Sequence, residues 1–303
     1  MQVLYLSTEY VSLRRRNTVI PNKIPAADIA SQFWCEMQVD LRRKYGKIEK
    51  IEMEKGKKIH KDKLLEISKV RPVEVKTPVD LLYSTLHNIS VGVHQYKRNG
   101  ISREFPVWFK FNSVTIRGII DEIREAEEGG NKRIRVVETK TRAVNRRPSP
   151  AQMYRDKIQG MIYWYGLNSL LNITFKTDEI YDAFDAKPED MSLSKEFIES
   201  SNIPQELAAW ETGTLLEAAI LGIVEKMMEL PELSNLIELR YIYQKSGNEI
   251  YKEEYKFDPE YFDQKMRWAL DYWLGRREPV PVGERNQWKC NFCGYKDKCP
   301  VVR

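Results

Sequence analysis

The segments SVTIRGIID (residues 113–121) and RIRVVETK (residues 133–140) decide the fold. Both are rich in β-branched residues, which favours two neighbouring strands. The first ends in Asp121, and the second leads through its apolar run into Glu138, Thr139 and Lys140. Carboxylates hold hard divalent cations through oxygen, and a lysine beside them can orient water or neutralise developing charge. The pattern therefore predicts a D…E-x-K centre for metal-dependent phosphodiester cleavage, although acid-x-basic is also typical of a solvated strand face.

The composition fits one large or two small domains with a real core, because 42% of the 303 residues are hydrophobic and 31% are charged. The net charge of +5 fits a phosphate-binding protein without requiring one. Basic residues gather at several places, and some of them flank the candidate acidic centre: Arg14 to Arg16, Lys55, Lys57, Lys58, Arg142, Arg146, Arg147, Arg155 and Lys157.

The sequence shows neither a membrane-spanning stretch nor the apolar segment of a secretory signal. No apolar stretch approaches the roughly twenty residues that a membrane span needs, and residues 1–10 lack a long apolar segment. We therefore expect a cytoplasmic protein that does not enter a membrane.

The cysteines point to a metal centre. Cys290, Cys293 and Cys299 form C-x2-C-x5-C among polar residues, while Cys35 stands far upstream in a helix-like stretch. A disulfide framework is unexpected in an intracellular chain. A triplet plus one cysteine suits a [4Fe–4S] cluster, although zinc also accepts four thiolates, and Cys35 by itself could be a buried core thiol. Such a centre would fasten the C-terminal tail to the first long helix.

Helices, then a short mixed sheet, then helices are expected along the chain, which predicts an α/β or α+β fold with one main core. The expected helices cover residues 26–45, 52–70, 77–97, 151–171 and 258–275, with a further helix opening at Pro204. The expected strands cover residues 103–112, 113–120, 132–139, 236–245 and 249–257, the last two joined by a hairpin at Ser246-Gly247-Asn248. Trp108, Phe109 and Phe111 could stack nucleobases, but a core role is the better interpretation.

With these residues in view, the chain resembles the RecB-like branch of the PD-(D/E)XK nucleases, and within it the exonuclease V (defects-in-morphology) family. The supporting blocks occur in the family's order and span most of the chain: Ile24 to Glu36, Gly56 to His60, Arg117 to Ile123, Val137 to Thr141, Gln159-x-x-x-Tyr163, and Trp273 to Cys299. No single block is decisive, whereas the ordered set together with the cysteines is specific.

The resemblance implies a role for each matching residue. His60, Asp121 and Glu138 would bind Mg²⁺ or Mn²⁺, with the Thr139 carbonyl as a further ligand, and Lys140 would be the catalytic lysine. The four cysteines, Cys35, Cys290, Cys293 and Cys299, would hold a [4Fe–4S] cluster of structural purpose. The residues expected to position DNA are Gln159 and Tyr163 of the Q-x-x-x-Y helix together with Arg142, Gln152 and Arg155.

The implied organisation is a single α/β nuclease domain over residues 1–303, with a PD-(D/E)XK core (25–171), a helical insertion (172–232) that could wall a DNA passage, and a tail with hairpin, helix and cysteines (233–303). The implied activity is exonucleolytic hydrolysis of single-stranded DNA in repair or processing. A monomer is expected, with a single-strand-binding protein as a candidate partner. Two alternatives stay open: a RecB-like nuclease that trims DNA in CRISPR adaptation, and a non-catalytic Fe–S module that binds DNA.

Overall fold

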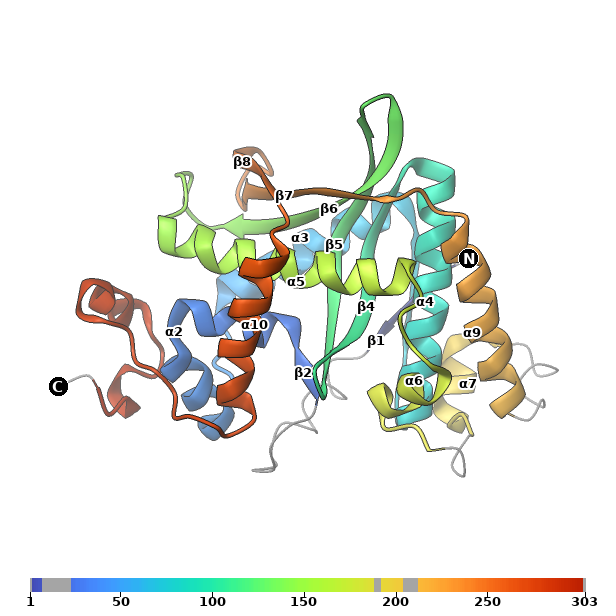
Figure 1. The fold of residues 1–303 in the computed structure, drawn as a ribbon, viewed down its shortest axis with the longest axis horizontal. Coiled ribbons are helices and arrows are strands. Elements are labelled where there is room, and N and C mark those ends of the chain that lie inside the picture. Colours follow the sequence, from blue (N-terminus) through green and yellow to red (C-terminus); the bar gives the residue numbers. More distant parts are fainter. Residues whose placement is uncertain (1, 7–22, 188–191, 204–211, 302–303) are drawn as a thin grey trace.

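The computed structural model describes residues 2–6, 23–187, 192–203 and 212–301. Within them the chain forms a mixed α/β fold around one six-stranded sheet (Figure 1). The strands of this sheet are β2 (Lys23–Pro25), β4 (Ile101–Phe111), β5 (Val114–Glu128), β6 (Asn131–Arg142), β7 (Leu233–Tyr243) and β8 (Glu249–Lys256).

The sheet opens between β5 and β6. Antiparallel pairing of these strands begins at Glu122 opposite Val137 and continues to the hairpin turn. On the same edge of β5, the short strand β2 pairs in parallel with Thr115 to Arg117. The edge of β5 is therefore unpaired over residues 118–121, while β6 continues beyond the opening in parallel pairing with β7. Asp121 stands in this opening, and the hairpin beyond it projects from the body (Figure 1).

Helices cover both faces of the sheet. On one face lie α5 (Pro150–Leu171), which crosses the strands, and beside it α2 (Ala26–Tyr45) and α10 (Pro259–Trp273). Behind the strands in Figure 1 lies α3 (Ile51–Ile67), and α4 (Pro78–Asn99) packs along β4. A two-stranded parallel sheet of β1 (Gln2–Leu6) and β3 (Lys69–Val73) packs beside α4.

The region 172–232 is helical where it is described. It contains α6 (Thr177–Phe184), α7 (Lys195–Ser201) and α9 (Thr212–Met228), and α9 packs against α4 through apolar residues such as Leu216 and Ile223. The helix start predicted at Pro204 lies outside the described residues. In the tail, two short 3₁₀ segments, η2 (Glu284–Phe292) and η3 (Lys296–Lys298), carry the cysteine triplet.

The predicted helices and strands are confirmed to within a few residues wherever they are described, with one exception: the strand predicted over residues 113–120 continues in β5 to Glu128, where it forms the long hairpin with β6. The mixed sheet flanked by helices is confirmed as well, and Trp108, Phe109 and Phe111 are core residues as expected. The strands β1, β2 and β3 were not predicted. Each has five residues or fewer, and β3 contains Pro72, which weakens any local strand signal.

Candidate active site

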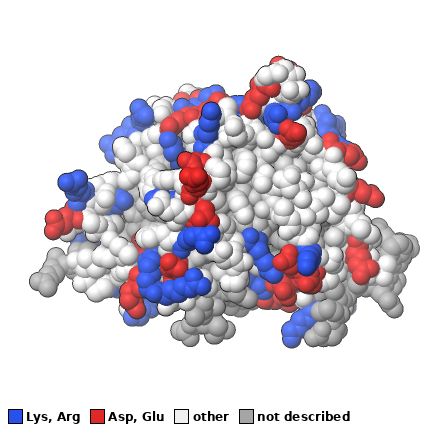
Figure 2. All heavy atoms as spheres, viewed as in Figure 1, with Lys and Arg blue, Asp and Glu red and all other residues white. Residues whose placement is uncertain are grey.

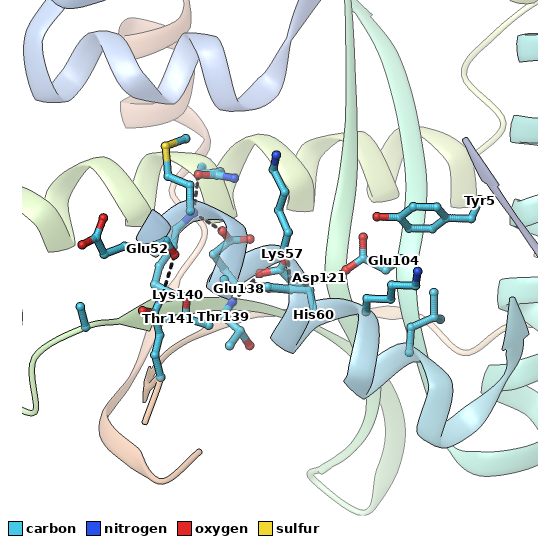
Figure 3. A pocket seen from close by; sticks show the side chains of 17 residues that line it. Tyr5, Glu52, Lys57, His60, Glu104, Asp121, Glu138, Thr139, Lys140 and Thr141 are labelled. Atoms are coloured by element: carbon cyan, nitrogen blue, oxygen red, sulfur yellow. Dashed lines mark hydrogen bonds and ion pairs between the residues drawn. The ribbon is translucent and has the colours of Figure 1, made fainter. Parts of the chain in front are cut away.

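A pocket of about 520 Å³ lies at the opening between β5 and β6. Its lining includes every predicted metal ligand of the nuclease centre and the predicted catalytic lysine: His60, Asp121, Glu138, Thr139 and Lys140. Figure 3 shows these side chains converging from α3 and from the two strands. The structure therefore brings together residues that are up to eighty positions apart in the chain.

The pocket draws on both faces of the sheet. Successive side chains of a strand point to opposite faces. Asp121 faces α3 and lies 3.5 Å from Nδ1 of His60 through its Oδ1 atom. Glu138 and Lys140 face α5 instead, since the Lys140 Nζ atom donates to the Gln159 side chain at 2.7 Å. Because the strands separate here, Asp121 from one face and Glu138 and Lys140 from the other can line one cavity.

Asp121 is tied to the second strand across the opening. The backbone N–H of Thr139 donates to Oδ2 of Asp121 at 2.7 Å, which leaves Oδ1 toward His60. Burial lowers the pKa of His60, but the surrounding carboxylates, led by Glu104, outweigh it, and the net pKa is raised. The imidazole is thus held in a strongly anionic setting that a cation would neutralise.

The buried Glu138 and the half-buried Lys140 form an ion pair with Oε1 and Nζ 2.5 Å apart. Burial, reinforced by Asp121, raises the pKa of Glu138 to about 8 although Lys140 acts in the opposite direction. Burial lowers the pKa of Lys140, but Glu138 and Asp156 more than compensate, and the ammonium stays charged. The Oε2 atom of Glu138 is buried without a hydrogen-bond partner. Burying an unpartnered carboxylate oxygen costs folding free energy unless another group binds it. A cation in the pocket would satisfy that atom.

Gln159 lines the pocket and binds Lys140, and Tyr163 accepts a hydrogen bond from Gln159. Because the Gln159 Oε1 atom accepts from Lys140, its Nε2 atom is free to donate to the Tyr163 hydroxyl at 2.9 Å. Both side chains are buried, and the Tyr163 ring packs so close to Gly118 that a Cβ there would lie 2.6 Å from it. Their contacts orient the lysine, and the predicted contact with DNA stays a prediction.

The other predicted DNA-contacting residues lie outside the pocket lining. Gln152 forms a capping box with Ser149 at the start of α5, and Arg142 donates to the Gln152 side chain at 3.2 Å. Arg155 is paired with Asp156 at 2.5 Å. Each is thus engaged within the protein, and a role in DNA binding stays a prediction.

Several residues that line the pocket were not identified as site residues from the sequence, among them Lys57, Lys61 and Glu104. Lys57 and Lys61 of α3 line the cavity, and Lys57 is paired with Glu54 at 2.6 Å. The basic character of residues 55–58 was the signal for Lys57, and no motif marks Lys61. Glu104 of β4 lies 3.6 Å from His60 Nδ1, and no motif marks it. No described residue of 172–232 lines this pocket, so the expected passage wall is not part of it.

The four cysteines lie near one another where the C-terminal tail meets α2. Burial raises the pKa of the Cys35 thiol, and Cys293, Cys290 and Cys299 each raise it further. Hydrogen bonds fasten the tail: Lys289 Nζ donates to the Trp34 carbonyl at 2.9 Å, and Gln38 Nε2 lies 3.6 Å from Cys293 Sγ. At Cys35 the helix is kinked, with φ −164° and ψ 111°. The tail thus contacts the first long helix, as expected, while a metal cluster that joins them stays a prediction.

Charge on the surface is mixed on the face shown in Figure 2, where Lys and Arg side chains are interspersed with Asp and Glu. The modest net charge of +5 therefore forms no continuous basic surface on that face. No helix in the described part of the chain is both long and apolar enough to cross a membrane.

A pH dependence follows from Glu138. Its folded-state pKa of about 8 exceeds the usual 4.5, so its contribution to the stability of the metal-free protein is complete below about pH 4.5 and is lost as the pH rises through 8. A bound cation favours the ionised carboxylate. We therefore expect the rise in melting temperature on adding Mn²⁺ to grow between pH 6 and pH 8.

Scanning calorimetry at half-unit pH steps, with and without Mn²⁺, measures this effect. Glu138→Gln should flatten the pH dependence, whereas Glu127→Gln, at an exposed position near the hairpin tip, should leave it unchanged. If Mn²⁺ raised the melting temperature of the unmodified protein equally at every pH, Glu138 would not be the group that binds the cation.

Comparison with known proteins assigns the chain to a family. The sequence profile of the family described as "Exonuclease V - a 5' deoxyribonuclease" matches residues 13–129 and 205–300. Exonuclease V of Danio rerio is 27% identical over 278 residues, which cover 89% of this chain and 68% of that protein. The crystal structure of SSO0001 covers 97% of this chain and 92% of its own at 13% identity, and its TM-score of 0.39 is too low to carry an argument. This chain therefore belongs to the exonuclease V family, a family of deoxyribonucleases.

Proposed function

We propose that this protein is a metal-dependent exonuclease that hydrolyses single-stranded DNA from its 5′ end. The observation that carries the proposal is the buried, unpartnered Oε2 atom of Glu138, a residue that lines the same cavity as Asp121 and His60 and that is paired with Lys140. The family description supports the DNA substrate and the 5′ polarity. The open sheet with carboxylates at its split supports a PD-(D/E)XK core.

The donor set fits Mg²⁺ or Mn²⁺. Oxygen atoms of Asp121 and Glu138, together with the Thr139 carbonyl and the His60 imidazole, would hold the metal. When bound, the cation would polarise the scissile phosphate and lower the pKa of an attacking water. Within the protein, Lys140 carries a fixed positive charge into the pocket, where it counters charge that develops on the phosphate.

Each other group of the centre then has a defined task. Gln159 holds the Lys140 ammonium from α5, and Glu138 holds it from β6, so the lysine is oriented before substrate arrives. The Thr139 N–H fixes the plane of the Asp121 carboxylate. Lys57 and Lys61 at the rim would attract the phosphates of an entering strand.

The cysteines support a [4Fe–4S] cluster held by Cys35, Cys290, Cys293 and Cys299. No three of their sulfur atoms lie within 4.8 Å of one another. The other three thiols are still close enough to raise the pKa of Cys35. Tetrahedral zinc with Zn–S bonds of about 2.3 Å would require the sulfurs to be closer, and a cubane accepts a wider spacing. The cluster would be structural, because its ligands do not line the nuclease pocket.

The family match favours an exonuclease V over the CRISPR-adaptation alternative. The complete set of carboxylates and lysine in one pocket argues against a non-catalytic DNA-binding module. A monomer that acts with a single-strand-binding protein stays our working proposal for its assembly.

Cleavage of labelled oligonucleotides tests the proposal. With protein purified under anaerobic conditions, Mg²⁺ or Mn²⁺ should release short products from the 5′ end of linear single strands, and EDTA should stop the release. Circular single strands and blunt duplexes are the matched controls and should resist. Equal cleavage of circular strands would refute exonuclease action, and tight binding without cleavage under any divalent metal would favour the binding module.

A further inference from the structure

We infer that an exposed apolar surface beside the nuclease pocket binds single-stranded DNA, with nucleobases stacked on Phe292 and Trp288. The inference rests on the single-stranded substrate proposed above and concerns the contacts that the strand makes outside the pocket. The surface, which we call the tail surface, consists of Tyr45, Ile48, Ile51, Met53, Trp288 and Phe292.

Two segments far apart in the chain build the tail surface. The first runs from the end of α2 into the first turn of α3, and the second is η2 of the C-terminal tail, which lies beside α2 in Figure 1. Ile48 packs on Gly294 so closely that a Cβ there would lie 2.9 Å from the isoleucine side chain. Lys50 Nζ donates to the carbonyl of Phe292 at 3.2 Å. These contacts hold the apolar side chains of both segments on one surface.

Large apolar side chains are exposed on this surface. Ile51 is 72% exposed, Phe292 66% and Trp288 40%. The centroids of the Phe292 and Trp288 rings are 6.4 Å apart, and Trp288 packs edge-on against Trp34 at 5.5 Å. A group of exposed apolar side chains marks a binding surface rather than a random feature of the exterior. Exposed aromatic rings are suited to stacking against nucleobases of any sequence.

The charge around the tail surface favours a polyanion. Residues 44–53 and 284–298 carry seven basic and four acidic residues, a net charge of +3, compared with +5 for the whole chain. Two ammonium groups, those of Lys44 and Lys298, lie over the Tyr45 ring at 5.3 Å and 4.4 Å. Neither they nor Lys50 forms an ion pair with a carboxylate of the described residues. Unpaired lysines around exposed aromatic rings suit the phosphates and bases of a single strand.

The tail surface is continuous with the nuclease pocket. Met53 belongs to the tail surface and also lines the pocket. It lies in the first turn of α3, the helix that carries His60 into the pocket about 10 Å further along its axis. A strand whose end lies in the pocket can therefore extend over Met53 to Phe292 and Trp288. This position favours DNA as the occupant over a second copy of the chain.

Binding measured without divalent metal tests the inference separately from cleavage. In EDTA, fluorescence anisotropy with a labelled single strand should give a Kd about tenfold higher for Phe292→Ala than for the unmodified, cluster-containing protein, because a stacked base would be lost. Phe292→Trp retains an aromatic ring and should restore the affinity. Phe292 lies between Cys290 and Cys293, so the preparations are compared at equal iron content.

An abasic strand separates stacking from charge. A strand whose interior bases are removed keeps every phosphate, and the unmodified protein should bind it about tenfold more weakly than the intact strand. Phe292→Ala should lose most of this discrimination. Lys50→Gln should lower the slope of log Kd against log salt by about 0.7. The controls are Leu65→Ala, at an exposed apolar position near the other end of α3, and Lys132→Gln, on the hairpin, and they should change neither quantity.

The possible results distinguish the inference from the proposed function. Weaker binding by Phe292→Ala that tryptophan restores, with reduced discrimination against the abasic strand, would establish stacking, since a purely structural role would not respond to the missing bases. An unchanged Kd for Phe292→Ala would overturn the inference and leave the proposed nuclease in place. If the same variant instead converted a dimer into a monomer in sedimentation velocity, the tail surface would be a contact between copies. An unmodified protein that bound no single strand would overturn the proposed substrate itself.

Discussion

Asp121→Asn is expected to abolish cleavage of single-stranded DNA, with a loss in kcat of at least about a thousandfold. The substituted side chain would retain an oxygen that can accept from the Thr139 N–H, so the junction between β5 and β6 should persist. The carboxylate charge that we propose as a metal ligand would be lost. Removing this charge also reduces repulsion of phosphate, and we therefore expect the variant to bind single strands at least as tightly as the unmodified protein.

Single-turnover cleavage of a 5′-labelled oligonucleotide, with fluorescence anisotropy for binding, separates the two effects. Asp62→Asn is the matched control, because Asp62 is an exposed carboxylate on the helix that carries His60. It should cleave at the normal rate. Retention of full Mg²⁺-dependent cleavage by Asp121→Asn would show that the chemistry does not depend on this pocket.

Cys290→Ser is expected to remove the brown chromophore and to destabilise the whole protein. A cluster held by Cys35 and Cys290 would close a loop of 255 positions, and the loop-closure entropy corresponds to about 5.5 kcal/mol. Existing contacts between the tail and α2, such as the Lys289 bond to Trp34, offset part of that loss. A fall in melting temperature of roughly 10 °C is the expected result for a chain of this size.

Iron and sulfide analysis of anaerobically purified protein, followed by thermal melting, measures both effects. Asn291→Ser is the control, since Asn291 is exposed and next to Cys290 in the same 3₁₀ segment. Its iron content and melting temperature should match those of the unmodified protein. A colourless, stable unmodified protein that contains zinc would refute the cluster and leave the thiolate ligand set in place.

Much of the fold was predictable from local patterns. The β-branched runs before Asp121 and Glu138 form strands because their alternation suits a half-buried sheet, and the Ser149 and Thr77 capping boxes mark helix starts close to those expected. The strands β1 and β3 were not predicted because their stability comes from pairing between distant segments, Gln2 opposite Lys69 onward, which no local window contains.

The same distinction applies to the site. The residues Asp121, Glu138 and Lys140 were predicted because their types and spacing on adjacent strands carry the chemistry. Glu104 was not, because its place beside His60 depends on a left-handed backbone in the middle of β4. Gln159 and Tyr163 were recognised by spacing, but the hydrogen bond from Lys140 to Gln159 and that from Gln159 to Tyr163 form only once α5 lies on the sheet.

The sequence by itself determined the chemical inventory: two carboxylates and a lysine on neighbouring strands, a histidine upstream and four thiols in two distant parts of the chain. Only the tertiary structure decided how these groups meet. The split between β5 and β6 admits side chains from opposite faces into one cavity, and the strained backbone of β4 adds a third carboxylate. The physical reason is that a donor's type is set by the residue, whereas its direction is set by strand pairing and packing between segments far apart in the chain.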